Sequence, residues 1–444
     1  MVVNPIDIVH SLEERVEDIL HNCTACGACA NVCPTPSIDG FDASDPEQIT
    51  QGILSLLKTG QGPDNAEAWT KGCCGSGFCQ SVCEHGINPR FMLAMAKLKL
   101  SKRAAPQERK QKGKGSFKTM SRGVRLLSRL QLTPELMAKL SPSSHPERTT
   151  APDIIFYTGC NMLKTPHIGL LCLDVLDRLN VSYEVHGGPA NCCGILQLRT
   201  GDDENSARQG GKTIERFAKT GASEVLSWCP SCEIQFNETL LPSVIVDKSK
   251  PFDVTMFSIF LARHLDRLKP LMTRAVPKRV ALHEYPGSIG VTDSVIAVLS
   301  AIPGLELVDL GLSRAGYQLG TMTNSDYAKK HVAELLRAGQ EAEITTFAGI
   351  YHADHRELIR HEPYWPFEVV NYMDLIGESM GLSRPDLYKK FRLMQDADLI
   401  MSEAKEMILA NNLDLEDMRD QIINEMLVEE ILAADPQKHP HGLV

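Results

Sequence analysis

The chain has 444 residues, a formal net charge of −10, and 43% hydrophobic and 23% charged residues. This is the composition of a globular protein of several domains, and the acidic excess argues against nucleic acid as a partner of the whole chain. No apolar run approaches the roughly 18 to 20 uncharged residues of a membrane span, and the charged N-terminus is unlike a secretion signal, so we expect a cytoplasmic protein.

The N-terminal hundred residues have the pattern of a helical domain. Apolar residues at three- and four-residue spacing predict a helix from Asp7 to about Leu20. Ser44, followed by Pro46 and Glu47, is typical of a second helix start, and a third helix is expected from Pro89. We therefore expect an all-α domain over residues 1–105, with cysteine-rich loops between its helices.

A basic segment follows. Residues 97–129 contain 12 Lys or Arg and a single acid, Glu108. Blocks of like charge usually mark solvated segments, so residues 106–150 are assigned to a basic linker. The alternative is peripheral docking of residues 97–129 onto an acidic partner or an anionic membrane surface.

From Pro152 onward, short apolar runs alternate with helical patterns. Strands are predicted over residues 153–157, 182–185 and 224–228, with a helix over 168–179. This alternation favours an α/β fold with a parallel sheet, in which ligands gather at the carboxyl ends of the strands. Cys160 and Cys229 both follow predicted strands.

Residues 277–385 repeat this plan without cysteines. Residues 279–287 correspond to 154–160, 343–347 to 224–228, and 366–376 to 251–261. We expect two pseudo-duplicated α/β domains, 151–276 and 277–385, of which the second has lost its metal ligands. An acidic helical C-terminal region, 386–444, completes the predicted multidomain architecture.

The placement of the 14 cysteines indicates metal binding. None follows Cys232, and all but Cys172 fall into three tight groups. Grouped cysteines in a long chain of this composition predict metal ligands before disulfides. Cys172 lies among leucines on a predicted helix, so it is interpreted as a small buried hydrophobic residue.

The first group has ferredoxin-type spacing, with Cys33 followed by Pro34. In this spacing three cysteines of one group bind one cubane, and the fourth cysteine binds the other cubane of a pair. The first [4Fe-4S] cluster therefore takes the ligands Cys23, Cys26, Cys29 and Cys83.

The second group is an altered copy of this motif, because Ser76 stands at the second ligand position. The second cluster retains Cys33, Cys73 and Cys79 and needs a fourth ligand. We favour Cys74, which requires the loop to reshape around Gly75 and Gly77. Ligation through the Ser76 oxygen and a [3Fe-4S] cluster are the two alternatives.

The third group contains more thiols than one cubane uses. Its five cysteines come from three predicted strand ends and are Cys160, Cys192, Cys193, Cys229 and Cys232. With Gly194 and the Cys229-Pro-Ser-Cys232 run, this group resembles the CCG domain of the B subunit of heterodisulfide reductase. Residues 1–105 likewise resemble the C subunit of that enzyme, a helical ferredoxin.

The resemblance implies that the five cysteines hold one non-cubane [4Fe-4S] cluster that reacts with disulfides. It also implies a flavoprotein or other heterodisulfide reductase-like subunits as partners. The sequence departs from the family in its second CCG motif, where Pro286-Gly287, residues 313–320 and residues 345–352 replace the expected cysteines. In this respect the chain resembles single-CCG proteins of sulfur metabolism, which act on protein-bound or lipoate-bound sulfur.

Polar residues occupy the altered positions of the second half. If the two halves face each other, these residues would line a substrate cavity opposite the cluster, where they could move protons or hold an anion. Simple filling of the vacated space is the alternative. The residues are His283, Tyr285, Arg314, Tyr317, His352 and His355.

Two functions remain open at this point. The first is an oxidoreductase subunit in which two ferredoxin-type clusters exchange electrons with a non-cubane cluster that makes or breaks S–S bonds. The second is an electron relay for a flavin-dependent hydroxy-acid oxidase, such as those for glycolate or lactate. The chain lacks a Gly-x-Gly-x-x-Gly motif, so both functions need an external electron donor or acceptor.

Overall fold

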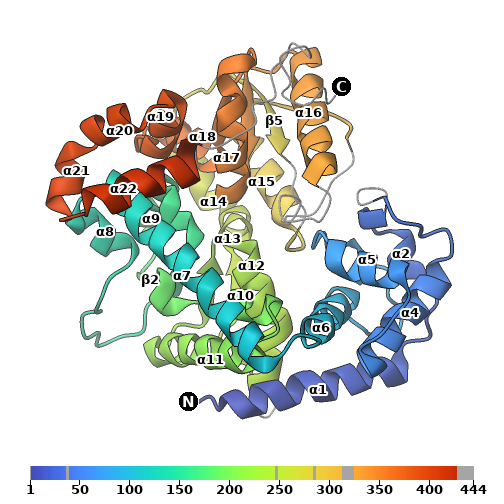
Figure 1. Cartoon of the computed structure of the whole chain (residues 1–444). Coiled ribbons are helices and arrows are strands. Elements are labelled where there is room, and N and C mark those ends of the chain that lie inside the picture. Colours follow the sequence, from blue (N-terminus) through green and yellow to red (C-terminus); the bar gives the residue numbers. More distant parts are fainter. Residues whose placement is uncertain (1, 37–39, 246–248, 284–286, 313–324, 428–444) are drawn as a thin grey trace.

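The computed structural model describes residues 2–36, 40–245, 249–283, 287–312 and 325–427 (Figure 1). A helical N-terminal region leads into an α/β region with two parallel sheets, and helices follow again at the C-terminal side. This order of structure agrees with the sequence prediction. Among the described helices, none combines the length and the apolar character that crossing a membrane requires.

The N-terminal region packs its helices around the buried Trp69. All three predicted helices form, but the second is capped by Asp45 rather than Ser44, and the Asp45 carboxylate accepts the Gln48 N–H at 2.9 Å. Asp45 is the better-placed cap because Pro46 then occupies the first helical position. The helices are α1 (Pro5–Asn22), α2 (Ala28–Asn31), α4 (Pro46–Thr59), α5 (Asp64–Gly72) and α6 (Pro89–Ser101).

The basic segment forms a helix, α7 (Pro106–Gln131), followed by α8 (Pro134–Leu140). The expectation of a solvated linker is wrong for this part of the chain. Val124, Leu127 and Leu130 recur at three-residue spacing and are fully buried, which the surrounding charges obscured in the sequence. On the polar face, Arg122 pairs with Asp417 at 2.8 Å.

The acidic partner of this basic helix thus lies within the same chain. Helix α7 contacts α21 (Lys405–Ala410) and α22 (Leu415–Ile422) of the C-terminal region, as Figure 1 also shows. The remaining described C-terminal helices are α19 (Leu387–Met394) and α20 (Ala397–Glu403). They share a hydrophobic core with the end of α7 and with the second sheet.

The first sheet has the strand order β2-β1-β3-β4, and all its strand pairs are parallel. Its strands are β1 (Ile154–Gly159), β2 (Tyr183–Gly187), β3 (Glu224–Ser227) and β4 (Asp253–Met256). The three sequence-predicted strands are all present. Helix α9 (Pro166–Arg178) follows β1 and contains Cys172, which is fully buried in the hydrophobic core as expected.

The second sheet repeats this topology in the order β6-β5-β7-β8, again with parallel pairs. Its strands are β5 (Arg279–His283), β6 (Glu306–Val308), β7 (Thr346–Gly349) and β8 (Glu368–Asn371). Strand β7 begins at Thr346 rather than at the expected residue 343, because Glu343 has a left-handed φ of 51° that ends the preceding helix instead.

The two sheets pack through equivalent helices. Helix α13 (Phe257–Arg263), which follows β4, contacts α15 (Val291–Leu299), which follows β5. In the corresponding way, α18 (Tyr372–Met380), which follows β8, contacts α9, which follows β1. Between the halves, the rings of Trp228 and Tyr372 stack with centroids 5.6 Å apart. The halves therefore meet through matching elements.

Candidate iron–sulfur centres

The thiols of the first cysteine group lie in the tight turn between α1 and α2. The turn uses two left-handed residues, Ala25 (φ 56°) and Gly27 (φ 76°). A Cβ atom on Gly27 would come within 2.7 Å of the Pro46 carbonyl carbon, so α4 can approach the turn only because residue 27 is glycine.

Charge interactions join this group to Cys83. Burial raises the pKa of Cys23, and the negative charges of Cys83 and Cys26 raise it further. The pKa of Cys29 rises to about 11, mainly through burial and further through Cys23 and Cys26. Neighbouring thiolates that disfavour each other's ionisation are stabilised by a bound cation. These four thiols fit the donor set predicted for the first cluster.

A second set of thiols gathers around Cys73. Burial, and then the charges of Cys74 and Cys33, raise the pKa of Cys73 to about 12. Burial also raises the pKa of Cys79, with Cys73 and Cys33 contributing. Gly75 and Gly77, in the loop between Cys74 and Cys79, adopt left-handed φ values of 74° and 80°.

Two polar groups contact the sulfurs of this second set. The indole N–H of Trp69 donates to the Cys33 sulfur at 3.2 Å, and the Thr35 hydroxyl donates to the Cys74 sulfur at 3.6 Å. Hydrogen bonds of this kind tune the reduction potential of a cluster held by such thiolates. Neither Trp69 nor Thr35 was identified from the sequence, because neither belongs to a cysteine motif.

The five cysteines of the third group meet at the carboxyl ends of β1, β2 and β3. Cys160 directly follows β1, Cys192 and Cys193 follow the turn after β2, and Cys229 begins the short helix α12 (Pro230–Ile234), which contains Cys232. Gly194 has a φ of 82°, and a Cβ there would lie 2.5 Å from a carbonyl oxygen of α11 (Asp203–Thr220). Glycine at this position lets the cysteine turn approach α11.

The five thiols interact with one another. The neighbouring Cys160 and Cys193 thiols lower the pKa of Cys192 well below its usual value. The neighbouring Cys232 thiol lowers the pKa of Cys229 to about 7. Five contacting thiols at one sheet edge, two of them disposed to lose their protons, form a donor set that fits an iron–sulfur cluster.

A tyrosine hydroxyl and a backbone N–H contact sulfurs of the third group. The hydroxyl of the fully buried Tyr157 donates to the Asn191 carbonyl at 2.7 Å and lies 3.7 Å from the Cys232 sulfur. The Gly194 N–H lies 3.4 Å from the Cys192 sulfur. These groups hold the thiols in place from β1 and from the cysteine turn itself.

Arg90 links the loop of the second cysteine group to the two α/β halves. Its guanidinium donates to both carboxylate oxygens of Glu238, to the Gly75 carbonyl at 3.1 Å and to the Gly287 carbonyl. Gly75 belongs to the second cysteine group, Glu238 lies six residues after Cys232, and Gly287 belongs to the second half. One buried side chain therefore links the ferredoxin-like region to both α/β halves.

Two of the predicted polar residues of the second half pair with aspartates. His283 lies 3.6 Å from Asp354, and His355 lies 2.6 Å from Asp386. Burial and then the charges of Arg356 and Lys164 hold the pKa of His352 well below its usual value. The predicted residues Tyr285, Arg314 and Tyr317 lie outside the described residues.

The second half nevertheless reaches the helix of the third cysteine group. Ser288, next to the altered Pro286-Gly287 position, donates a hydrogen bond to Glu233. Glu233 directly follows Cys232, and burial raises the pKa of its carboxyl group. The sequence analysis missed Ser288 and Glu233, because their proximity depends on how the two sheets pack.

Comparisons with known proteins agree with this division of the chain. Residues 17–88 match the 4Fe-4S dicluster domain, and residues 154–237 match the cysteine-rich CCG domain. The first range contains both ferredoxin-like cysteine groups, and the second contains the five cysteines of the third group. In its domain content the chain resembles a fusion of the C and B subunits of heterodisulfide reductase.

Curated relatives of this heterodisulfide reductase-like protein come from methanogens. It is 25% identical to the D subunit of the dihydromethanophenazine:CoB–CoM heterodisulfide reductase of Methanosarcina mazei, over 66% of this chain and 75% of that protein. The D subunit of the Methanosarcina barkeri enzyme is also 25% identical, over 66% and 76%. The B subunit of the fumarate reductase (CoM/CoB) of Methanothermobacter marburgensis is 22% identical, over 84% and 64%. The chain is thus an iron–sulfur protein of an electron-transfer family.

Proposed function

We propose that this heterodisulfide reductase-like protein is the subunit of a multisubunit oxidoreductase that makes or breaks the S–S bond of a thiol or disulfide substrate. The observation that carries the proposal is the set of five interacting thiols at the ends of β1, β2 and β3, linked through Arg90 to the loop of the second thiol set. A pure electron relay needs no such five-thiol group, since four cysteines satisfy a cubane.

The cluster ligands are proposed as three sets. Cys23, Cys26, Cys29 and Cys83 would hold the first [4Fe-4S] cluster. Cys33, Cys73, Cys79 and Cys74 would hold the second, and the charge contacts of Cys74 with Cys73 and Cys33 favour it over the Ser76 oxygen or a [3Fe-4S] cluster. The non-cubane cluster would be held by Cys160, Cys192, Cys193, Cys229 and Cys232. When bound, this cluster supplies a metal site that can exchange electrons with substrate sulfur.

The chain's own residues orient this site. Tyr157 keeps its hydroxyl near the Cys232 sulfur, and burial together with the Cys232 charge keeps the pKa of that hydroxyl well above its usual value, so it stays a hydrogen-bond donor. Glu233, whose pKa burial raises, shares a hydrogen bond with Ser288 and is the nearest acid to the Cys229–Cys232 turn in sequence. We propose that Glu233 holds a proton for substrate sulfur.

The second α/β half is proposed to be a CCG domain that has lost its cluster. Identical strand order and matching helix contacts between the halves support a duplication. The proposed domain limits are 1–105, 106–150, 151–276, 277–385 and 386–444. The basic helix α7, in the second of these ranges, packs against the C-terminal helices. The partners are proposed to be a flavoprotein or other heterodisulfide reductase-like subunits.

Disulfide turnover by the anaerobically purified protein tests the proposal. Reduced viologen supplies electrons, and CoB–CoM heterodisulfide and lipoamide serve as substrates. We expect turnover with at least one of them, and loss of it in Cys192→Ser. Cys172→Ala is the matched control, because Cys172 is equally buried but lies on α9 in the hydrophobic core.

The alternative function predicts a different result. If the protein contains its full iron, turns over neither disulfide, and passes electrons from a flavin-dependent hydroxy-acid oxidase to an acceptor, it is a relay. Unchanged disulfide turnover in Cys192→Ser would refute a role for the five-thiol group in S–S chemistry.

A further inference from the structure

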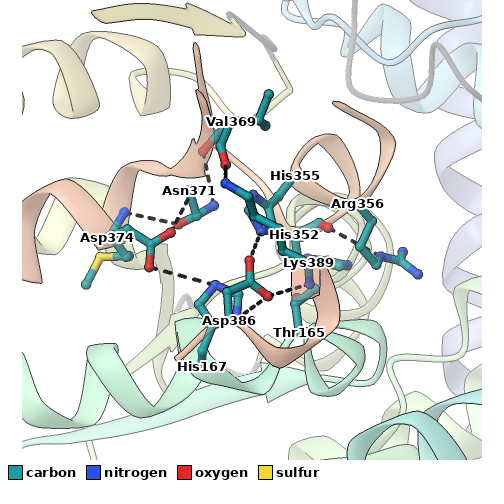
Figure 2. Close-up of polar contacts among 12 residues, drawn as sticks. Thr165, His167, His352, His355, Arg356, Val369, Asn371, Asp374, Asp386 and Lys389 are labelled. Carbon is teal, nitrogen blue, oxygen red and sulfur yellow. Dashed lines mark hydrogen bonds and ion pairs between the residues drawn. The ribbon is translucent and has the colours of Figure 1, made fainter. Parts of the chain in front are cut away.

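A buried cluster of two histidines and one aspartate lies where the first half, the second half and the C-terminal region meet. His167 lies in the first turn of α9, His355 on α17 (His352–Leu358), and Asp386 caps the N-terminus of α19. One ligand atom from each of the three lies within 4.8 Å of the others. Figure 2 shows the two rings directed toward the Asp386 carboxylate.

The donor atoms around Asp386 are close to one another. The His355 Nε2 atom lies 2.6 Å from Asp386 Oδ2, and the His167 Nδ1 atom lies 3.4 Å from Asp386 Oδ1. Ligand atoms of a tetrahedral zinc ion, each about 2.0 to 2.2 Å from the metal, lie roughly 3.3 Å apart. A small adjustment of this cluster therefore brings three donors to zinc-binding separations.

His167 lacks a well-formed hydrogen bond at both ring nitrogens. The residue is 2% exposed, and neither Nδ1 nor Nε2 has a hydrogen-bond partner among the described residues. Buried imidazole nitrogens almost always have partners, so an unsatisfied pair calls for a bound species. Carboxylate oxygens face the two nitrogens at 3.4 and 3.8 Å without forming a hydrogen bond, and a metal ion at Nδ1 would supply a direct partner.

A carboxylate stands behind His167. Asp374 Oδ1 lies 3.8 Å from Nε2, on the side of the ring opposite Asp386. Histidine ligands commonly place their second ring nitrogen against a carboxylate, which orients the ring and strengthens the metal bond. In this cluster, Asp374 would be the carboxylate behind His167, and the metal would lie on the other side of the ring, toward Asp386 and His355.

The charges near the cluster also suit a cation. Asp374 and Asp386 are both largely buried. The nearby cation Lys389 is already neutralised, because its Nζ atom lies 2.5 Å from Glu362 and 2.8 Å from the Val369 carbonyl. Two buried carboxylates thus remain beside two histidines, and buried charge requires compensation.

Ring geometry separates this cluster from a second one of similar composition. The His167 and His355 rings are tilted by 60° with centroids 5.4 Å apart, and two imidazoles on one zinc ion at about 2.0 Å have centroids roughly 5 Å apart. The rings of His145 and His186, beside Glu184, are instead stacked at 4.3 Å and 21°. The donor atoms of that cluster also lie within 4.8 Å of one another, but His145 is exposed, whereas His167 and His355 are buried.

We propose that His167, His355 and Asp386 bind a Zn²⁺ ion that joins the two α/β halves and the C-terminal helices. Two imidazoles and a carboxylate favour zinc over the oxygen-preferring Mg²⁺ and Ca²⁺. The site is independent of the cysteine clusters and of the proposed disulfide chemistry. Its role is structural, since the two histidines are buried, Asp386 is partly buried, and the three residues come from separate parts of the chain.

The metal content of the full-length protein tests this site. We expect about one zinc per chain after dialysis against EDTA, with iron unchanged, and less than about a tenth of that zinc in His355→Gln and Asp386→Asn. Asp386→Asn preserves the side-chain cap that accepts the Lys389 N–H at 2.9 Å. His186→Gln is the matched control and should retain zinc.

Zinc X-ray absorption of the wild-type protein provides a test that needs no variant. Nitrogen and oxygen neighbours at about 2.0 Å support the site, whereas sulfur neighbours at about 2.3 Å would assign the zinc to a cysteine site and overturn the proposal. Absence of zinc from protein with full iron content, or zinc retained in both His355→Gln and Asp386→Asn, would overturn it as well.

Discussion

Replacing Arg90 by Met should loosen the contact between the ferredoxin-like region and the α/β region. Arg90 is 7% exposed, and its partner Glu238 is also largely buried. The substitution leaves that carboxylate without its cation and removes a donor from the Gly75 and Gly287 carbonyls. Breaking a buried ion pair from one side costs about 3 to 5 kcal/mol.

Two neighbours reduce this cost. Gln80 donates to Glu238 at 2.7 Å, and the Arg15 guanidinium donates to the Glu238 backbone carbonyl at 2.7 Å. We therefore expect the lower limit, about 3 kcal/mol, which raises the population of the opened interface roughly a hundredfold. Hydrogen exchange of α6 and of the Gly75 loop, with urea unfolding followed by circular dichroism, measures both effects.

An exposed arginine in the same region provides the control. Arg103 pairs with Glu67 at 2.5 Å on the surface, and Arg103→Met should leave the urea midpoint nearly unchanged, because exposed ion pairs contribute little. In a double-mutant cycle, Glu238→Gln should cost less in the Arg90→Met background than in the wild type. Equal urea midpoints for Arg90→Met and Arg103→Met would refute the role of Arg90.

Three further predictions concern the cysteine sites. Trp69→Phe removes the hydrogen-bond donor to the Cys33 sulfur. A lost hydrogen bond of about 1 kcal/mol should lower the reduction potential of the second cluster by about 40 mV, measured by EPR redox titration. An unchanged reduction potential would exclude a role for this contact. Cys74→Ala should lower the iron content and Ser76→Ala should not, and the reverse result would make serine the ligand. Gly194→Ala should destabilise the protein by about 2 kcal/mol or more in thermal unfolding, because the alanine Cβ would lie 2.5 Å from an α11 carbonyl oxygen. An unchanged Tm in this variant would contradict the close approach.

Local patterns determined much of this protein. Helix periodicity, proline positions and alternating apolar runs predicted the helical first region and the strands β1, β2 and β3, because these features depend on neighbours within a few residues. The basic helix α7 was not recognised, since its apolar residues Val124, Leu127 and Leu130 are few among many charges. Leu127 and Leu130 are buried in the core that includes the C-terminal region, almost three hundred residues away in sequence, whereas Val124 packs into a separate core that includes the first half.

Cysteine spacing was enough to identify the residues that could bind iron, because it reflects the short loops that hold each cluster. The surroundings of these cysteines depend on tertiary packing. Arg90 reaches Glu238 across 148 residues, and His167 meets His355 only after the two sheets pack. Contacts of this kind arise from the packing of whole elements, and no local pattern specifies which polar groups that packing brings together.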